Sequence, residues 1–226
     1  MMARRWVLGL IAGSAAVLLS GCGLMSSRAS YRFRMTVEVE TPNGLRTGSS
    51  VYEFTAAKKK MRFLAEEVSG GVRTRGEATI IDLDGGPVFV TLVSPDAVES
   101  LGSGATDTLL ATLSDNGGDD YIAAIDKLGG WFADPVSAEL PREKWPLMVR
   151  FGDLNDPASA QPVNPDVIGV KRIFLETTRD EVTVGIRKRL GWLYEDLPNG
   201  NVISGPTKNP KFKMTLRKYD FDSELL

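Results

Sequence analysis

The fold is decided by ten consecutive residues, Tyr31-Arg32-Phe33-Arg34-Met35-Thr36-Val37-Glu38-Val39-Glu40. Apolar side chains occupy every second position of this stretch, and charged side chains or threonine occupy the positions between them. Strict alternation is typical of a β-strand that has one face in the core and the other in solvent. We therefore expect Phe33, Met35 and Val37 to be buried in an antiparallel sheet.

The residues that follow this stretch predict further strands of the same kind. Thr41-Pro42-Asn43-Gly44 has the residues of a tight turn, so a second strand at about 46–56 is expected to return beside the first. The run 88–93 is almost entirely apolar, which predicts a central strand that is buried on both faces. Other strands are predicted at 72–83, 147–151, 170–177 and 211–219.

Helices are predicted at few places. Ser94-Pro95-Asp96 resembles a helix start with proline in the first turn. Residues 119–128 have apolar side chains at helical spacing and are followed by two glycines. Residues 180–190 fit both a helix and a strand, and we favour the helix. The stretch 100–104, rich in glycine and serine, is interpreted as a flexible loop.

These elements together predict an α+β fold of mainly antiparallel β-sheet, as a sandwich or partly closed barrel, with two or three short helices. The chain has 226 residues, of which 42% are hydrophobic and 25% are charged, as in ordinary globular proteins. No internal linker interrupts residues 31–226, so we expect them to form a single domain.

The first residues have the features of an export signal. Two positive charges, Arg4 and Arg5, precede an apolar run at 6–20 that is too short to span a bilayer. The run ends in Leu19-Ser20-Gly21-Cys22, which matches the lipobox of bacterial lipoproteins. An ordinary signal peptide with a chance cysteine is the alternative interpretation, and a twin-arginine signal fits the residues around Arg4 and Arg5 poorly.

The resemblance to a lipobox implies lipidation of the Cys22 thiol and cleavage between Gly21 and Cys22. Residues 1–21 would then be a signal peptide and residues 22–30 a lipidated tether to the membrane. Gly23 follows the cysteine, where an aspartate would imply retention in the inner membrane. We therefore expect the protein to be anchored in the outer membrane and to face the periplasm.

The part of the chain after the tether also resembles known sequences. The segments 31–54, 76–92, 149–157 and 170–193 are similar to parts of a family of uncharacterised bacterial exported proteins. That family has no assigned activity, fold or ligand, so the resemblance implies a cell-envelope protein and assigns no functional residue.

Composition excludes several classes of chemistry. The chain has no histidine and one cysteine, which removes Ser-His-Asp and Cys-His catalysis and the usual zinc sites. Its 27 basic and 29 acidic residues give a net charge of −2, which is not the basic surface of a nucleic-acid-binding protein. We expect no cofactor.

Two acidic loops have oxygen ligands of the kind that calcium prefers. The first contains Asp115 and Asp119, and the second contains Asp153 and Asn155. The first fails the EF-hand spacing, and both residue types also form turns and helix starts. We favour turns without metal.

Two basic runs are candidates for contact with anionic lipid headgroups. One covers residues 58–62, and the other is Arg187, Lys188 and Arg189, close to Trp192. A run of charges is more often a solvated surface.

Taken together, the sequence favours a non-enzymatic, lipid-anchored envelope protein that presents a binding surface to a protein or glycan partner. A cell-wall glycan hydrolase that uses carboxylates alone is one alternative. A carrier of a small ligand or lipid, with an apolar cavity inside a curled sheet, is another.

Overall fold

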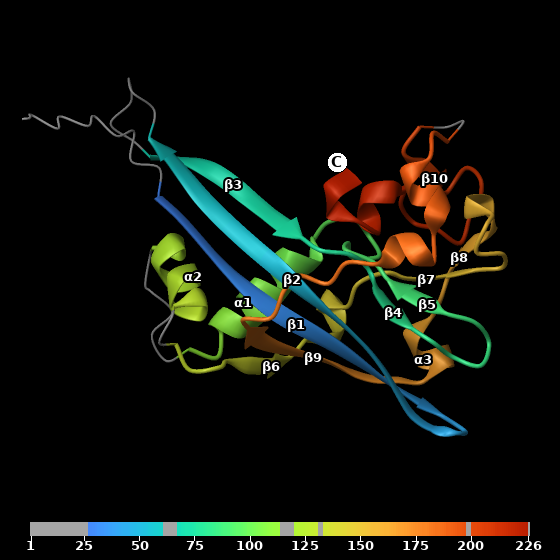
Figure 1. Cartoon of the computed structure of the whole chain (residues 1–226), viewed down its shortest axis with the longest axis horizontal. Helices are drawn as coiled ribbons and strands as arrows, with labels where there is room; N and C mark the ends of the chain where they lie inside the picture. The colour runs from blue at the N-terminus through green and yellow to red at the C-terminus, as the bar shows by residue number, and fades with distance from the viewer. Residues whose placement is uncertain (1–26, 61–66, 114–119, 131–132, 198–199, 226) are drawn as a thin grey trace, which may run out of the picture.

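The computed structural model describes residues 27–60, 67–113, 120–130, 133–197 and 200–225. Within these ranges the chain forms three antiparallel sheets and three α-helices, which confirms the predicted α+β class (Figure 1). The sheets stack as layers and do not close into a barrel.

The largest sheet has the strand order β3-β2-β1-β9-β6, with bounds β1 Ser27–Thr41, β2 Gly44–Lys60, β3 Glu67–Arg75, β6 Ser137–Glu139 and β9 Val170–Thr178. A second sheet has the order β4-β5-β7-β8, with bounds β4 Thr79–Ile81, β5 Val88–Val90, β7 Met148–Phe151 and β8 Ala160–Pro162. The third pairs β10 Val202–Ser204 with β11 Leu216–Arg217.

The α-helices are α1 Leu101–Leu110, α2 Tyr121–Gly129 and α3 Pro165–Ile168. Short 3₁₀ helices are η1 Arg142–Lys144, η2 Pro157–Ser159, η3 Ile186–Lys188, η4 Gly191–Tyr194, η5 Lys218–Asp220 and η6 Ser223–Leu225.

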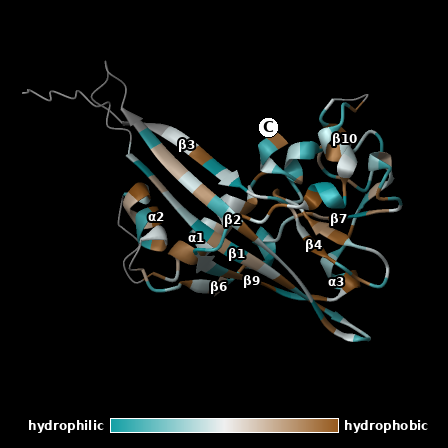
Figure 2. Ribbon diagram, viewed as in Figure 1, coloured by the Kyte–Doolittle hydropathy of each residue, from teal (hydrophilic) through white to brown (hydrophobic). Residues whose placement is uncertain are grey.

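The predicted hairpin forms the two longest strands of the largest sheet. All of β1 pairs with β2 in one continuous register that closes at Thr41 and Gly44. Hydrophobic and hydrophilic residues alternate along β1 from Tyr31 to Glu40 (Figure 2). Phe33, Met35 and Val37 are 0% exposed, so their predicted core position is confirmed.

Helices α1 and α2 pack against the inner face of this sheet (Figure 1). The predicted helix at 119–128 is confirmed over its described part, because α2 follows Asp120, whose carboxylate accepts hydrogen bonds from two backbone N–H groups. The hydroxyl groups of Tyr31 and Thr106 are 2.9 Å apart, which joins β1 to α1.

Two predictions are wrong near the start of α1. The expected loop at 100–104 is helix, with Ser100 as its N-cap. Gly102 fits there because a Cβ atom would come within 1.9 Å of the Thr74 hydroxyl, so the glycine allows close packing on β3. The expected helix start at Ser94 is instead a turn, in which the Asp96 carboxylate accepts hydrogen bonds from the Ser94 hydroxyl and a backbone N–H.

The second sheet is the middle layer of the molecule. In β5, Val88 and Val90 belong to the core beneath the largest sheet, and Phe89 belongs to a second core on the opposite side. The predicted central strand, buried on both faces, is therefore confirmed over Val88–Val90.

The C-terminal part of the chain covers the other face of this middle layer. Its buried side chains include Trp192, Leu193 and Phe221. The predicted strand at 211–219 is regular only at Leu216–Arg217, although Phe212 and Met214 are buried as the alternation predicted.

The helix that we favoured at 180–190, directly after β9, is wrong. This segment crosses the outer face of the largest sheet as an extended chain and forms only the short η3. Arg34 forms an ion pair with Asp180, and Thr183 exchanges hydrogen bonds with Val51 at the free edge of β2. These contacts with the sheet replace the hydrogen bonds of a helix.

The two sheets meet at Gly48 of β2. A Cβ atom at this position would lie 2.3 Å from the carbonyl oxygen of Ile80 in β4. The predicted strand at 72–83 is in fact two strands, β3 and β4, because the chain leaves the largest sheet after Arg75 and joins the middle layer.

Candidate binding site

The start of β1 shows where the proposed anchor enters the domain. Leu19, Ser20, Gly21 and Cys22 lie outside the described residues, so the lipobox interpretation stays a prediction. Ser27–Ser30 were expected in the tether, but they form the start of β1 because they pair with β2. The entry point of the chain is therefore the N-terminal end of this strand.

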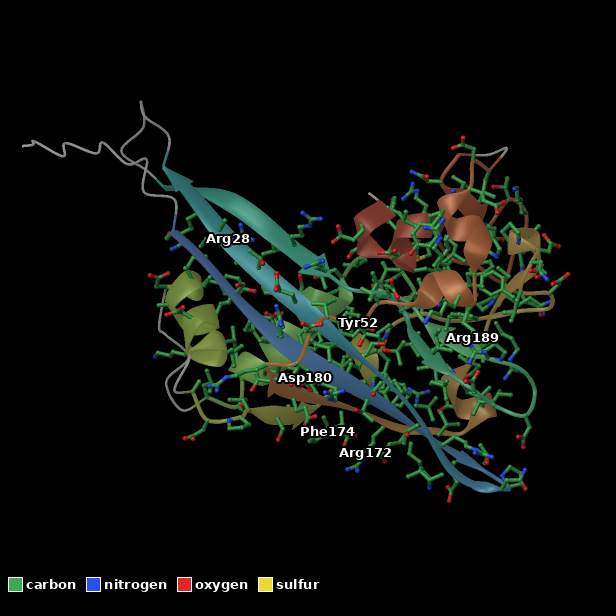
Figure 3. All side chains as sticks on the ribbon, viewed as in Figure 1. Arg28, Tyr52, Arg172, Phe174, Asp180 and Arg189 are labelled. Atoms are coloured by element: carbon green, nitrogen blue, oxygen red, sulfur yellow. The ribbon has the colours of Figure 1, made fainter. Side chains whose placement is uncertain are left out.

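One predicted basic run lies at the same end. Ser27 pairs with Lys58, and Arg28 is nearby at the end of the sheet (Figure 3). Lys58 forms an ion pair with Asp120, 3.1 Å away. Residues 61 and 62 of this run lie outside the described residues.

The other basic run lies in the half of the molecule remote from this entry point, where Figure 3 labels Arg189. Arg189 forms an ion pair with Asp82, and the Arg187 guanidinium lies 4.8 Å from the centre of the Tyr194 ring. Lys188 is exposed. Trp192 is only 6% exposed, and its indole N–H donates a hydrogen bond to the Leu154 carbonyl, so it packs in the second core.

The acidic loops give no assembled metal centre in the described parts of the chain, where no three potential ligands gather. Asp115 and Asp119 lie outside those parts. The carboxylate of Asp153 accepts hydrogen bonds from the backbone and side-chain amides of Asn155, which is the geometry of a turn.

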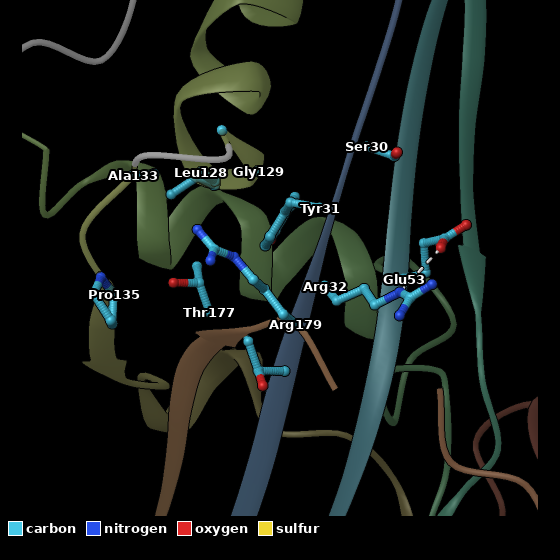
Figure 4. Close-up of a pocket in the computed structure, with 12 residues that line it drawn as sticks. Ser30, Tyr31, Arg32, Glu53, Leu128, Gly129, Ala133, Pro135, Thr177 and Arg179 are labelled. Atoms are coloured by element: carbon cyan, nitrogen blue, oxygen red, sulfur yellow. Dashed lines mark hydrogen bonds and ion pairs between the residues drawn. The ribbon is translucent and has the colours of Figure 1, made fainter. Parts of the chain in front are cut away.

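A cavity of about 620 Å³ lies near the entry point, where β9 ends and leaves the side of β1 uncovered (Figure 4). Arg179 points into it, and the nearby Arg32 forms an ion pair with Glu53 at 3.3 Å. We call it the anchor-end cavity. It opens at the end of the domain that a lipid at Cys22 would hold against the bilayer.

A second cavity, of about 550 Å³, lies between the segments 142–148, 162–165 and 211–214. We call it the distal cleft. Its walls are mainly apolar and include four prolines, Pro95, Pro146, Pro162 and Pro165. Trp145 lies in the wall, where its indole N–H donates a hydrogen bond to the Leu140 carbonyl.

Positive charge surrounds this apolar surface. Arg142, Lys211 and Lys213 line the distal cleft together with a single carboxylate, that of Glu143. Arg142 forms an ion pair with Asp166, whereas neither lysine forms an ion pair with a described residue. Both lysines are exposed.

The distal cleft is far from the entry point of the chain. Pro165 in its wall begins α3, and the following Gly169 accepts a hydrogen bond from the N–H of Glu40. Glu40 lies thirteen residues beyond Ser27 in β1. At the usual rise of a strand this separation is about 45 Å, and Figure 1 shows α3 at the opposite end of the molecule from the start of β1.

Sequence patterns did not reveal a group of buried carboxylates. Burial raises the pKa of Asp220 to about 6. The pKa of Glu77 is also raised, first by burial and further by the adjacent Asp222. Each of the three accepts a hydrogen bond within the C-terminal layer, from the N–H of Arg217, the N–H of Ile186 and the hydroxyl of Tyr194. None of the three lines either cavity.

Comparison of the chain with known protein families, curated proteins and solved structures finds no match. The resemblance to uncharacterised bacterial exported proteins therefore stays a prediction. No helix in the described ranges is long and apolar enough to cross a membrane.

Proposed function

We propose that the protein is a lipid-anchored, non-enzymatic protein of the cell envelope that binds a protein or glycan partner in the distal cleft. The observation that carries this proposal is the position of the α3 wall of the cleft. Gly169, directly after α3, bonds to Glu40, which is about 45 Å along β1 from the point where the chain enters the domain. Such a cleft would face away from the bilayer, most simply from the outer membrane into the periplasm, where a partner can reach it.

The two alternatives have less support. Hydrolysis by two carboxylates needs a pair of acids about 5–10 Å apart across the substrate. Among the described residues, Glu53 is the one acid in the lining of the anchor-end cavity, and Glu143 is the one acid in that of the distal cleft. A carrier needs space inside the sheet, but fully buried side chains such as Phe33 and Phe54 fill the inner face.

Anchoring is tested by the substitution Cys22→Ser in the full-length chain. We expect the wild-type protein to incorporate labelled palmitate and to sediment with the outer membrane. The variant should take no label and should accumulate as precursor or be released. Ser20→Ala is the matched control, since it keeps a small residue in the lipobox and should be labelled normally. Labelling of the serine variant, or none of the wild type, would contradict the lipid anchor.

Binding in the cleft is tested by photo-crosslinking in cells. A photoreactive residue at the exposed position 143 lies in the distal cleft, and one at the exposed position 208 is a control outside it. We expect a discrete adduct from position 143 and none from position 208. Equal patterns from both positions, or no adduct from either, would count against a binding role for the cleft.

A further inference from the structure

The walls of the distal cleft are poor in groups that recognise sugars. Proline lacks a backbone N–H, so the four prolines offer no backbone donors. Much of the remaining wall is apolar and includes Leu147, Met148 and Phe212. A glycan covered in hydroxyl groups would lose hydrogen bonds with water here without replacing them.

Neither aromatic residue of the described lining offers a free ring face: Phe212 is only 2% exposed, and Trp145 is covered by an arginine. The guanidinium carbon of Arg142 lies 4.2 Å from the centre of the Trp145 ring. This cation–π contact covers one face of the indole, and the whole residue is only 6% exposed. Little ring surface is left for stacking against a sugar, whereas apolar side chains can contact the edges of the ring and the prolines.

One wall of the distal cleft is formed by a continuous segment of the chain. Residues 211–214 line the cleft consecutively, directly before β11. The backbone N–H and C=O groups of Lys213 and Met214 have no hydrogen-bond partner among the described residues. A polypeptide laid along this wall could form hydrogen bonds with such groups.

The charged side chains of this wall favour a polypeptide with a negative net charge. The side chains of Lys211 and Lys213 point to solvent on both sides of the buried Phe212. Among the described residues neither forms an ion pair, although Lys213 has a favourable electrostatic interaction with the exposed Asp96 outside the cleft. The described lining carries three positive charges and one negative charge, that of Glu143. Complementary charges favour an acidic partner.

We propose that the distal cleft binds an extended acidic segment of a partner protein, in which carboxylates alternate with apolar side chains. The carboxylates would pair with Lys211 and Lys213, and the apolar side chains would contact the prolines and Trp145. This inference rests on the proposed binding function and commits it to a protein rather than a glycan partner.

The test uses the full-length chain in detergent and fluorescent octapeptides with blocked ends. Three peptides carry valine at every second position, with glutamate, glutamine or lysine between the valines, and a neutral amino-sugar tetrasaccharide is the fourth probe. We expect the glutamate peptide to bind at least tenfold more tightly than the other three, as measured by fluorescence anisotropy and by competition. Its affinity should fall as salt is raised.

The double substitution Lys211→Glu with Lys213→Glu should weaken binding of the glutamate peptide at least tenfold, and Lys208→Glu should leave it unchanged. All three lysines are exposed, so thermal melts should show intact folding. Preferred binding of the tetrasaccharide or the glutamine peptide, or equal affinity of the double variant and wild type, would overturn the acidic-segment inference. Failure of the crosslinking at position 143 would instead count against the proposed function itself.

Discussion

The two cores of the molecule are built in different ways. Beneath the largest sheet, one strand alone contributes Phe33, Met35 and Val37, all fully buried at regular intervals. On the other side of the middle layer, the second core gathers Phe89, Trp192 and Phe221 from short strands and 3₁₀ turns far apart in the chain. The first core follows from local periodicity, and the second depends on contacts that no single segment encodes.

The polar content of the two regions differs as well. The described part of β1 places its charges on the outer face, where Glu38 forms two hydrogen bonds with Arg172. The C-terminal layer buries Glu77, Asp220 and Asp222 instead. We therefore expect the first region to respond mainly to changes in packing and the second to changes in pH.

The largest effect is expected in the first core. Phe33→Ala removes a fully buried ring that stacks on Tyr52 with 5.3 Å between ring centres. The free energy of unfolding should fall by about 3–5 kcal/mol, as measured by urea denaturation. Glu38→Ala, on the outer face of the same strand, should cost less than about 1 kcal/mol. An unchanged midpoint for Phe33→Ala would show that β1 does not hold the core together.

A smaller loss is expected where the two sheets meet. Gly48→Ala would place a Cβ atom 2.3 Å from the Ile80 carbonyl oxygen, so the sheets must move apart. We expect a loss of about 2–3 kcal/mol, as overpacked cores show. The matched control is Gly191→Ala, because its Cβ would meet nothing within 4 Å. Equal melting temperatures for the two variants would mean that the sheets do not pack tightly at Gly48.

The smallest change in the free energy of unfolding is expected in the second region, and it is a gain in stability rather than a loss. Burial raises the pKa of Asp220 from 3.8 to about 6 in the folded state, so the folded protein binds this proton more tightly than the unfolded chain does. Its contribution to stability is fully present below about pH 4 and is lost as pH rises through about 6. Above pH 6 the ionised carboxylate is a cost to the fold.

Asp220→Asn should therefore stabilise the protein at pH 7.5 by about 1–2 kcal/mol, below the limit of about 3 kcal/mol for a shift of two pKa units. The amide oxygen can still accept the hydrogen bond from the N–H of Arg217. The gain should vanish at pH 4, as urea denaturation at both pH values would show. The exposed Asp134→Asn should change stability by less than about 0.5 kcal/mol at either pH. A gain that is independent of pH would argue against titration of Asp220.

The sequence predicted the first region well because its signals are local. The alternation in β1 is enough to orient its side chains, and the turn at Pro42 and Asn43 sets the return of β2. The helix favoured at 180–190 failed because its stripe of Val182, Ile186 and Leu190 also suits a chain held by tertiary contacts. Asp180 and Thr183 bind the sheet instead of a helix backbone.

The candidate site was not predictable in the same way. The distal cleft unites three segments and Pro95, and their prolines and lysines, taken singly, are typical of turns and solvated surfaces. Likewise Glu77 and Asp220 resemble any acid on an exposed strand or loop, since burial by a distant segment leaves no local pattern.

The pairing of β1 has a mechanical consequence. All of its residues pair with β2, and Arg32–Val39 also pair with β9. The hydrogen bonds of an antiparallel pair run perpendicular to the strands. A pull between a lipid at Cys22 and a partner in the distal cleft would act along β1 and load these bonds together, in shear, rather than opening them one at a time. The strand that begins at the tether would thus serve as the tensile element of the molecule.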